Sequence, residues 1–228
     1  MAKLFKPSSF RRLKDELRLG LSRSYVGLGV DPQRYLRHIQ RTYGLQIDSF
    51  TDMQYVPLDY IEFIARQALG ASTKWAALEG AGFGLGGFLL IVPDMGVLSA
   101  ITIRLIQKLS LLYGFEYATE EESVMLWMAA ASAAGVELGR DFLEKQAAER
   151  IVPAIIERMA ARMSAEVAEK WGSRLLPAVG GVIGGILNYY FVREWGRRAQ
   201  EHFRRRYVQN AALPTGLRDG PLRSIGSD

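Results

Sequence analysis

Hydrophobic residues recur at three- and four-residue spacings along most of the chain. Ile155, Met159 and Met163, for example, follow one another at four-residue steps, which places them on one face of a helix. Alternating runs are short, and no Asn-Gly or Asp-Gly hairpin turn joins two of them, so strand signals are scarce. The pattern therefore predicts an all-α fold formed by a single compact multi-helix domain.

Capping residues and helix breakers divide this pattern into elements. Asp31 followed by Pro32 predicts a helix start, and Gly44 predicts its end. Gly70 and the prolines at positions 93 and 153 predict further breaks. The boundaries predict helices over residues 32–43, 57–69, 74–92, 94–113, 119–136, 138–150, 153–171 and about 175–208, followed by a disordered tail over 209–228.

Two apolar segments rich in glycine stand out, at residues 75–92 and 175–193. Each is about 18 residues long, at the lower limit of what spans a bilayer. They favour either a pair of membrane-inserting or lipid-contacting helices packed on each other, or a buried helix pair at the centre of a soluble all-α domain. In the first case we expect a lipid or acyl chain to bind in the groove between the two helices. The predicted groove residues are Glu79, Gly80, Gly84, Gly87, Arg104, Gly181 and Gly185.

Ionisable residues inside these apolar stretches are candidate functional groups. If the chain turns back at Pro93, Glu79 and Arg104 lie at similar distances from the turn and can form a buried ion pair. We expect such a pair to fix helix register rather than to catalyse a reaction. A hydrolase or lipid-modifying enzyme that uses Glu79, Asp94 or Glu137 is the less favoured alternative.

The composition limits the chemistry further. The 228 residues include 49% hydrophobic and 23% charged residues, which fits one globular domain. The absence of cysteine excludes disulfides, thiolate metal sites and a cysteine nucleophile, and two histidines leave little room for a histidine-based site. A G-x-G-x-x-G string at 82–87 follows helix-like rather than strand-like sequence, so we expect no nucleotide there. We therefore predict no cofactor, metal or catalytic residue.

Charge is concentrated at the two ends of the helical region. Residues 1–43 carry a net charge of +7 and residues 193–206 a net charge of +4, whereas the stretch between them carries −6. Each basic end combines arginines with an apolar stripe, which is typical either of a helix on an anionic membrane or of a helix docked on the core. The first interpretation predicts a membrane-surface set of Arg11, Arg12, Lys14, Arg18, Arg193, Trp195, Arg197, Arg198, Phe203, Arg204 and Arg205.

The N-terminal sequence has no apolar run or cleavage site typical of a secretory signal. We therefore expect the protein in the cytoplasm or on the cytoplasmic face of a membrane. The acidic middle of the chain and the lack of a recognised nucleic-acid module argue against nucleic-acid binding.

Several features occur together in an order that resembles the EcsC protein family. They are the E-G-A-G-F-G-L-G-G stretch from Glu79, the Pro93-Asp94 pair, a helix that ends in Leu-Tyr-Gly at 112–114, the acidic residues 120–122 and a second glycine-rich segment that leads into an arginine-rich helix. The resemblance covers about residues 55–208, which leaves a basic helical region over 1–54. It implies a bacterial, helical, membrane-associated protein, and it transfers no active-site residue.

The leading hypothesis is a non-enzymatic protein that binds lipid or acyl chains and the anionic cytoplasmic membrane surface. The family takes its name from a protein encoded beside an ABC transporter, so an accessory role to a transporter is part of this hypothesis. The alternative is a soluble helical scaffold that binds a protein partner, and either form can assemble into a homo-oligomer.

Overall fold

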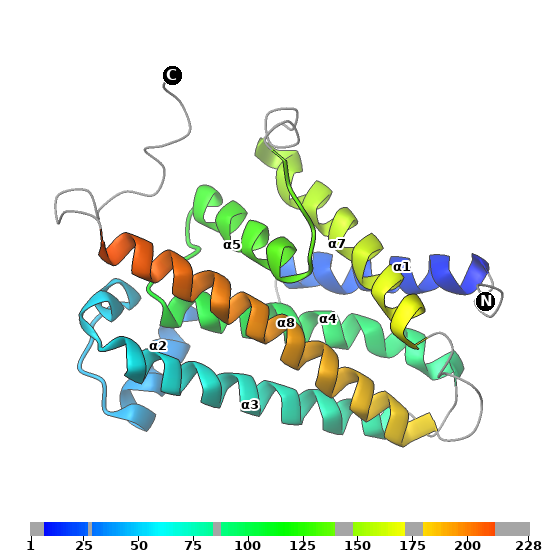
Figure 1. Cartoon of the computed structure of the whole chain (residues 1–228), viewed down its shortest axis with the longest axis horizontal. Helices are drawn as coiled ribbons and strands as arrows, with labels where there is room; N and C mark the ends of the chain where they lie inside the picture. The colour runs from blue at the N-terminus through cyan, green and yellow to red at the C-terminus, as the bar shows by residue number, and fades with distance from the viewer. Residues whose placement is uncertain (1–6, 27–28, 84–87, 140–147, 172–179, 213–228) are drawn as a thin grey trace.

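The computed structural model describes residues 7–26, 29–83, 88–139, 148–171 and 180–212. Within these ranges the chain forms helices and no strands, which confirms the predicted all-α fold. The helices in chain order are α1 (Pro7–Val26), α2 (Pro32–Tyr43), the 3-10 helix η1 (Phe50–Tyr55), α3 (Leu58–Phe83), α4 (Phe88–Leu112), α5 (Glu120–Ala133), α7 (Ala148–Trp171) and α8 (Gly180–Ala211) (Figure 1).

Helix α2 has both of its predicted ends and α5 has its predicted start, whereas α5 ends at Ala133, before the predicted end at residue 136. The Asp31 carboxylate accepts a hydrogen bond from the backbone N–H of Arg34 at 3.1 Å, and Gly44 ends α2 with a φ of 66°. At the start of α5, the Thr119 hydroxyl accepts from the N–H of Glu122, whose side chain accepts from the N–H of Thr119. These contacts satisfy backbone donors that a helix start would otherwise leave unpaired.

The predicted breaks at Gly70, Pro93 and Pro153 are wrong. Helix α3 continues through Gly70, α4 through Pro93 and Asp94, and α7 through Pro153. Each proline is the sixth residue of its helix, where it removes only one of the first hydrogen bonds along the ladder. A glycine inside a helix costs about 1 kcal/mol, which the packing of the long helix α3 offsets.

The other predicted boundaries have mixed outcomes. Residues 136–139 are irregular rather than helical, and the rest of the predicted helix over 138–150 lies mostly outside the described residues. Helix α8 begins at Gly180 and ends at Ala211. The predicted disordered tail, apart from its first residues, also lies outside the described ranges.

Helix α4 lies at the centre of the molecule and packs against α1, α3, α5 and α8. Its Leu105, Ile106 and Leu109 are completely buried. One hydrophobic core runs from Leu13 in α1 to Phe203 in α8. The basic region before residue 54 therefore shares the core of the domain.

Gly196 lets three helices meet closely in this core. A Cβ added to Gly196 would lie 2.5 Å from Cδ1 of Leu69 on α3 and 2.6 Å from Cδ2 of Leu105 on α4. An alanine at this crossing would therefore force the ends of both leucine side chains to shift.

Helices α3 and α8 run antiparallel side by side. Leu69 is level with Gly196, and farther along the pair Glu62 contacts Arg204. As a result α3 ends where α8 begins, and α4 begins at the same end of the molecule, on the right in Figure 1. We call this the glycine-rich end, because Phe83, Phe88 and Gly180 border or lie within the two glycine-rich segments.

Candidate functional site

The apolar stripes of both basic helices belong to the core. Leu13, Leu17 and Leu21 of α1 are buried, as are Trp195 and Phe203 of α8, which are 1% and 0% exposed. Trp195 and Phe203 were predicted to contact a membrane surface, and that prediction is wrong. Their stripe docks on the helical core, which is the other interpretation that the sequence left open.

Most basic residues of α8 pair with carboxylates. The Arg204 Nε atom lies 2.6 Å from Oε1 of Glu62 on α3, and Arg205 lies 3.6 Å from Glu201. The Arg204–Glu62 pair joins α8 to α3, the Arg205–Glu201 pair lies within α8, and both neutralise charge along the C-terminal half of α8. This half points away from the glycine-rich end, since eleven residues of helix between Arg193 and Arg204 span about 16 Å.

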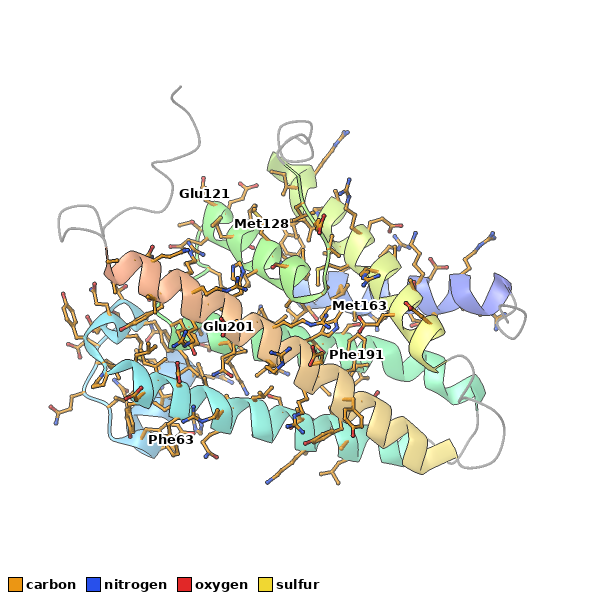
Figure 2. All side chains as sticks on the ribbon, viewed as in Figure 1. Phe63, Glu121, Met128, Met163, Phe191 and Glu201 are labelled. Atoms are coloured by element: carbon orange, nitrogen blue, oxygen red, sulfur yellow. The ribbon has the colours of Figure 1, made fainter. Side chains whose placement is uncertain are left out.

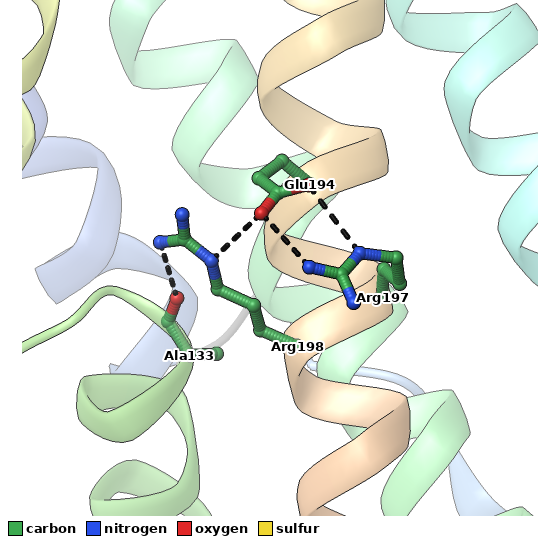
Figure 3. Close-up of polar contacts among 4 residues, drawn as sticks. All are labelled: Ala133, Glu194, Arg197 and Arg198. Atoms are coloured by element: carbon green, nitrogen blue, oxygen red, sulfur yellow. Dashed lines mark hydrogen bonds and ion pairs between the residues drawn. The ribbon is translucent and has the colours of Figure 1, made fainter.

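Glu194 holds two arginines at once (Figure 3). Its Oε1 atom lies 2.9 Å from Nε of Arg198 and 3.1 Å from Nη2 of Arg197. Arg198 also donates to the carbonyl of Ala133 at the end of α5, at 3.4 Å. Hydrogen bonds from Arg197 and the nearby charges hold the pKa of Glu194 below its usual range. This cluster connects α8 to α5, so Arg198 has a structural contact rather than a free surface position.

The basic residues of α1 divide in the same way. Lys14 and Arg18 both face Glu157 on α7, with Arg18 at 3.9 Å. Arg11 and Arg12 are exposed in the first two turns of the helix. Because α1 starts at the glycine-rich end, these two arginines lie toward it (Figure 1).

The two basic helices lie on different sides of the molecule. Helix α1 packs on α4 and α7, whereas α8 packs on α3, α4 and α5. The predicted membrane-surface set is therefore split, and no single face presents all of it.

The predicted ion pair between Glu79 and Arg104 does not fit the observed helices. Helix α3 ends at Phe83 and α4 continues from Phe88 through Pro93, and Leu105 on α4 is level with Leu69 on α3. Glu79 is ten residues farther along α3, about 15 Å away along the helix axis. Arg104 is also exposed.

The other residues of the predicted lipid groove lie in the two glycine-rich segments. The side chain of Glu79 and the surroundings of Gly80, Gly84, Gly87, Gly181 and Gly185 lie outside the described residues. Asp94, a candidate of the enzyme alternative, also has an undescribed side chain, and Glu137 is exposed in the segment after α5. The described residues contain no group of three or more side chains that could hold a metal ion.

The polar residues that follow Arg104 on α4 have a structural role. The Gln107 side chain accepts a hydrogen bond from the backbone N–H of Val30 at 2.9 Å. Lys108 lies over the ring of Tyr35 on α2, 5.8 Å from its centre, and burial together with Arg104 lowers the pKa of Lys108. These contacts fasten the segment before α2, and α2 itself, to the central helix.

The structure reveals an exposed group of apolar residues that the sequence pattern does not single out. Trp75 and Leu78 on α3 are 59% and 68% exposed, Tyr190 on α8 is 56% exposed and Val97 on α4 is 38% exposed. The antiparallel register places all four at one level of the α3–α4–α8 bundle, next to the glycine-rich end. We call them the apolar belt. The available sequence signal was that Trp75 is the first residue of one glycine-rich segment and that Tyr190 lies near the end of the other.

Two exposed cations lie at the level of this belt. Lys74 precedes Trp75, and Arg193 lies less than one turn beyond Tyr190. The guanidinium of Arg193 donates to the hydroxyl of Tyr189 at 3.0 Å and lies 5.7 Å from the centre of its ring. Arg193 makes no ion pair with any acidic side chain that the structure describes.

Exposed apolar residues are not confined to this end. Tyr55, Val208 and Phe63 lie toward the other end of the bundle, where Figure 2 shows Phe63 on α3. There, Phe63 packs against the rings of Tyr43 and Tyr60. None of the helices, over the residues that the structure describes, is both long and apolar enough to cross a membrane.

The fold and this surface together define a class: an all-helical protein with one hydrophobic core over the described residues, and with exposed apolar and cationic side chains near one end of the α3–α4–α8 bundle. The chain belongs to the EcsC protein family, whose model matches residues 28–208. This confirms the resemblance seen in the sequence. The match starts before the predicted boundary at residue 55 and includes α2 and η1, while the division into regions at 54 and 208 stays a prediction.

A curated relative is similar to this chain over most of its length. It is Protein EcsC of Bacillus subtilis (strain 168), which is 27% identical over 154 residues. The match covers 65% of this chain and 64% of the relative, so the chain spans less than two thirds of the relative it matches. No solved structure matches the chain.

Proposed function

We propose that this protein binds the surface of anionic membranes through its glycine-rich end, with the apolar belt at the boundary between lipid headgroups and acyl chains. The observation that carries the proposal is the belt itself. Tryptophan and tyrosine prefer this boundary because their rings are apolar and their polar atoms can remain hydrated.

The charge near the belt supports the same orientation. Lys74, Arg193, Arg11 and Arg12 are exposed and lie at or toward the glycine-rich end. A lysine or arginine close to an anionic leaflet contributes about 1 kcal/mol of attraction. By contrast, the arginines of α8 beyond Arg193 are largely paired with Glu194, Glu62 and Glu201.

The sequence beyond the belt is suited to shallow insertion. Residues 79–83, 88–97 and 180–187 at the ends of α3, α4 and α8 contain only two ionisable residues, Glu79 and Asp94. Three such helix ends can enter the headgroup and upper acyl region together without a helix that crosses the bilayer. The function proposed is thus that of a non-enzymatic, peripheral lipid-binding protein on the cytoplasmic side of a membrane.

Co-flotation with vesicles tests this proposal. Wild-type protein should float with vesicles that contain phosphatidylglycerol and should float less with pure phosphatidylcholine. A double variant W75A/Y190A should lose most of this binding, because it removes the two aromatic side chains of the belt. Tyr55→Ala is the matched control, since Tyr55 is an aromatic residue that is 79% exposed at the other end of the bundle.

The outcomes separate the two main hypotheses. If wild-type protein stays at the bottom with anionic vesicles at both low and high salt, membrane binding is refuted. A soluble scaffold for a protein partner, such as a transporter subunit, then becomes the better account. If Y55A and W75A/Y190A lose binding equally, the glycine-rich end is not the contact surface.

A further inference from the structure

The arginines exposed along α8 fall into two groups by their partners. Arg197, Arg204 and Arg205 each contact a glutamate, at 3.1, 2.6 and 3.6 Å. Arg193 instead contacts an aromatic residue, the Tyr189 one turn before it, through both hydroxyl and ring. Its positive charge is therefore held in place without being neutralised by a described acidic group.

The surroundings of Arg193 favour an anionic ligand at a membrane surface. Tyr189 packs edge-on against Tyr190 of the apolar belt, with ring centres 5.7 Å apart. The guanidinium thus lies next to the aromatic side chain that we place at the acyl boundary, in the layer that lipid phosphates occupy. A guanidinium presents a planar set of donors that matches two oxygens of a phosphate group.

We infer that Arg193, positioned by Tyr189, binds the phosphate of an anionic lipid headgroup. This inference rests on the proposed membrane binding and adds to it a specific residue and a ligand group. Tyr189 is a positioning residue, because its hydroxyl fixes the guanidinium and reduces the conformational freedom that binding would otherwise remove.

Two vesicle types distinguish phosphate recognition from general attraction to negative charge. One contains phosphatidic acid and the other contains oleate in the same phosphatidylcholine host, with the two adjusted to equal zeta potential. Wild-type protein should bind the phosphatidic acid vesicles more tightly. Arg193→Gln should weaken that binding about five- to tenfold and should remove most of the difference between the two vesicle types.

The control variants are on the same helix. Arg197→Gln removes another exposed arginine, one turn away, that is paired with Glu194, so its affinity for phosphatidic acid vesicles should stay within about twofold of wild type. Tyr189→Phe keeps the ring and loses the hydroxyl, and it should weaken binding less than Arg193→Gln does. Thermal unfolding of each variant checks that the fold is intact.

Three results would overturn the inference while leaving membrane binding in place. They are equal losses for Arg193→Gln and Arg197→Gln, equal binding of wild type to both vesicle types, or full rescue of the phosphatidic acid preference in Arg193→Lys, which would show that a point charge is sufficient. If wild type binds neither vesicle type, the proposed function fails and the inference fails with it.

Discussion

At the residue scale, two glycines inside helices have opposite roles. Gly70 lies in α3 with no atom within 4 Å of the position that a Cβ would take, whereas the Cβ of residue 196 would overlap Leu69 and Leu105. The sequence shows both as glycines at helical positions. Only the packing distinguishes them.

Exchanging each for alanine should therefore change stability in opposite directions. Gly70→Ala should raise the free energy of unfolding by about 0.5–1 kcal/mol, because it reduces the freedom of the unfolded chain without a clash. Gly196→Ala should lower it by about 1–3 kcal/mol, since the core is already full at the crossing. Chemical denaturation measures both, and a stabilising Gly196→Ala would show that the three helices are not in close contact.

The aromatic residues show how far sequence reasoning reaches at this scale. The spacing of Trp195 and Phe203 correctly predicts one face of a helix, but the same spacing fits a membrane surface and a core. Trp195 is buried and Trp75 is exposed, and this difference depends on which helices pack beside each one. That information is tertiary and is absent from a local pattern.

At the scale of elements, local chemistry predicted the starts of α2 and α5 because the capping groups at each start lie within three residues of each other. The breaks at Gly70, Pro93 and Pro153 failed because a helix tolerates a single unfavourable residue when long-range packing stabilises it. The error at Pro93 also moved the turn of the α3–α4 pair, and this alone made Glu79 and Arg104 appear to be neighbours.

The link between α8 and α5 should depend on pH through Glu194. Its pKa is lowered in the folded state, so its stabilising contribution is complete above the ordinary carboxyl pKa and disappears as pH falls through the lowered value. Glu194→Gln should cost less than about 1 kcal/mol at neutral pH, because the group is partly exposed.

Urea denaturation of wild type and Glu194→Gln, near pH 7 and near pH 3, measures this effect. The two curves should differ at neutral pH and converge in acid. Arg193→Gln serves as a control, because Arg193 contacts no carboxylate among the described residues. A difference that persists unchanged in acid would contradict the role of the Glu194 carboxylate.

At the scale of the whole molecule, one core joins helices that the family match includes with α1, which lies before residue 28. Helices α1 and α8 cover different sides of α4, so the charge at the two ends of the sequence does not form one surface. What the fold brings to one end is instead the starts of α1, α4 and α8 and the end of α3. The apolar belt and its cations therefore distinguish this end of the molecule from the other end, and the proposed membrane binding predicts that this end faces the lipid.

The orientation of the protein on a membrane can be measured with labels on single introduced cysteines, because the chain has no cysteine of its own. Single cysteines at Leu78, which is 68% exposed in the apolar belt, and at Tyr55, which is 79% exposed at the other end, can carry an environment-sensitive fluorophore. On addition of phosphatidylglycerol vesicles, the label at position 78 should shift to shorter wavelength and become accessible to quenchers in the acyl chains, while the label at 55 should remain in water. Equal shifts at both positions, or a shift at 55 alone, would contradict binding through the glycine-rich end.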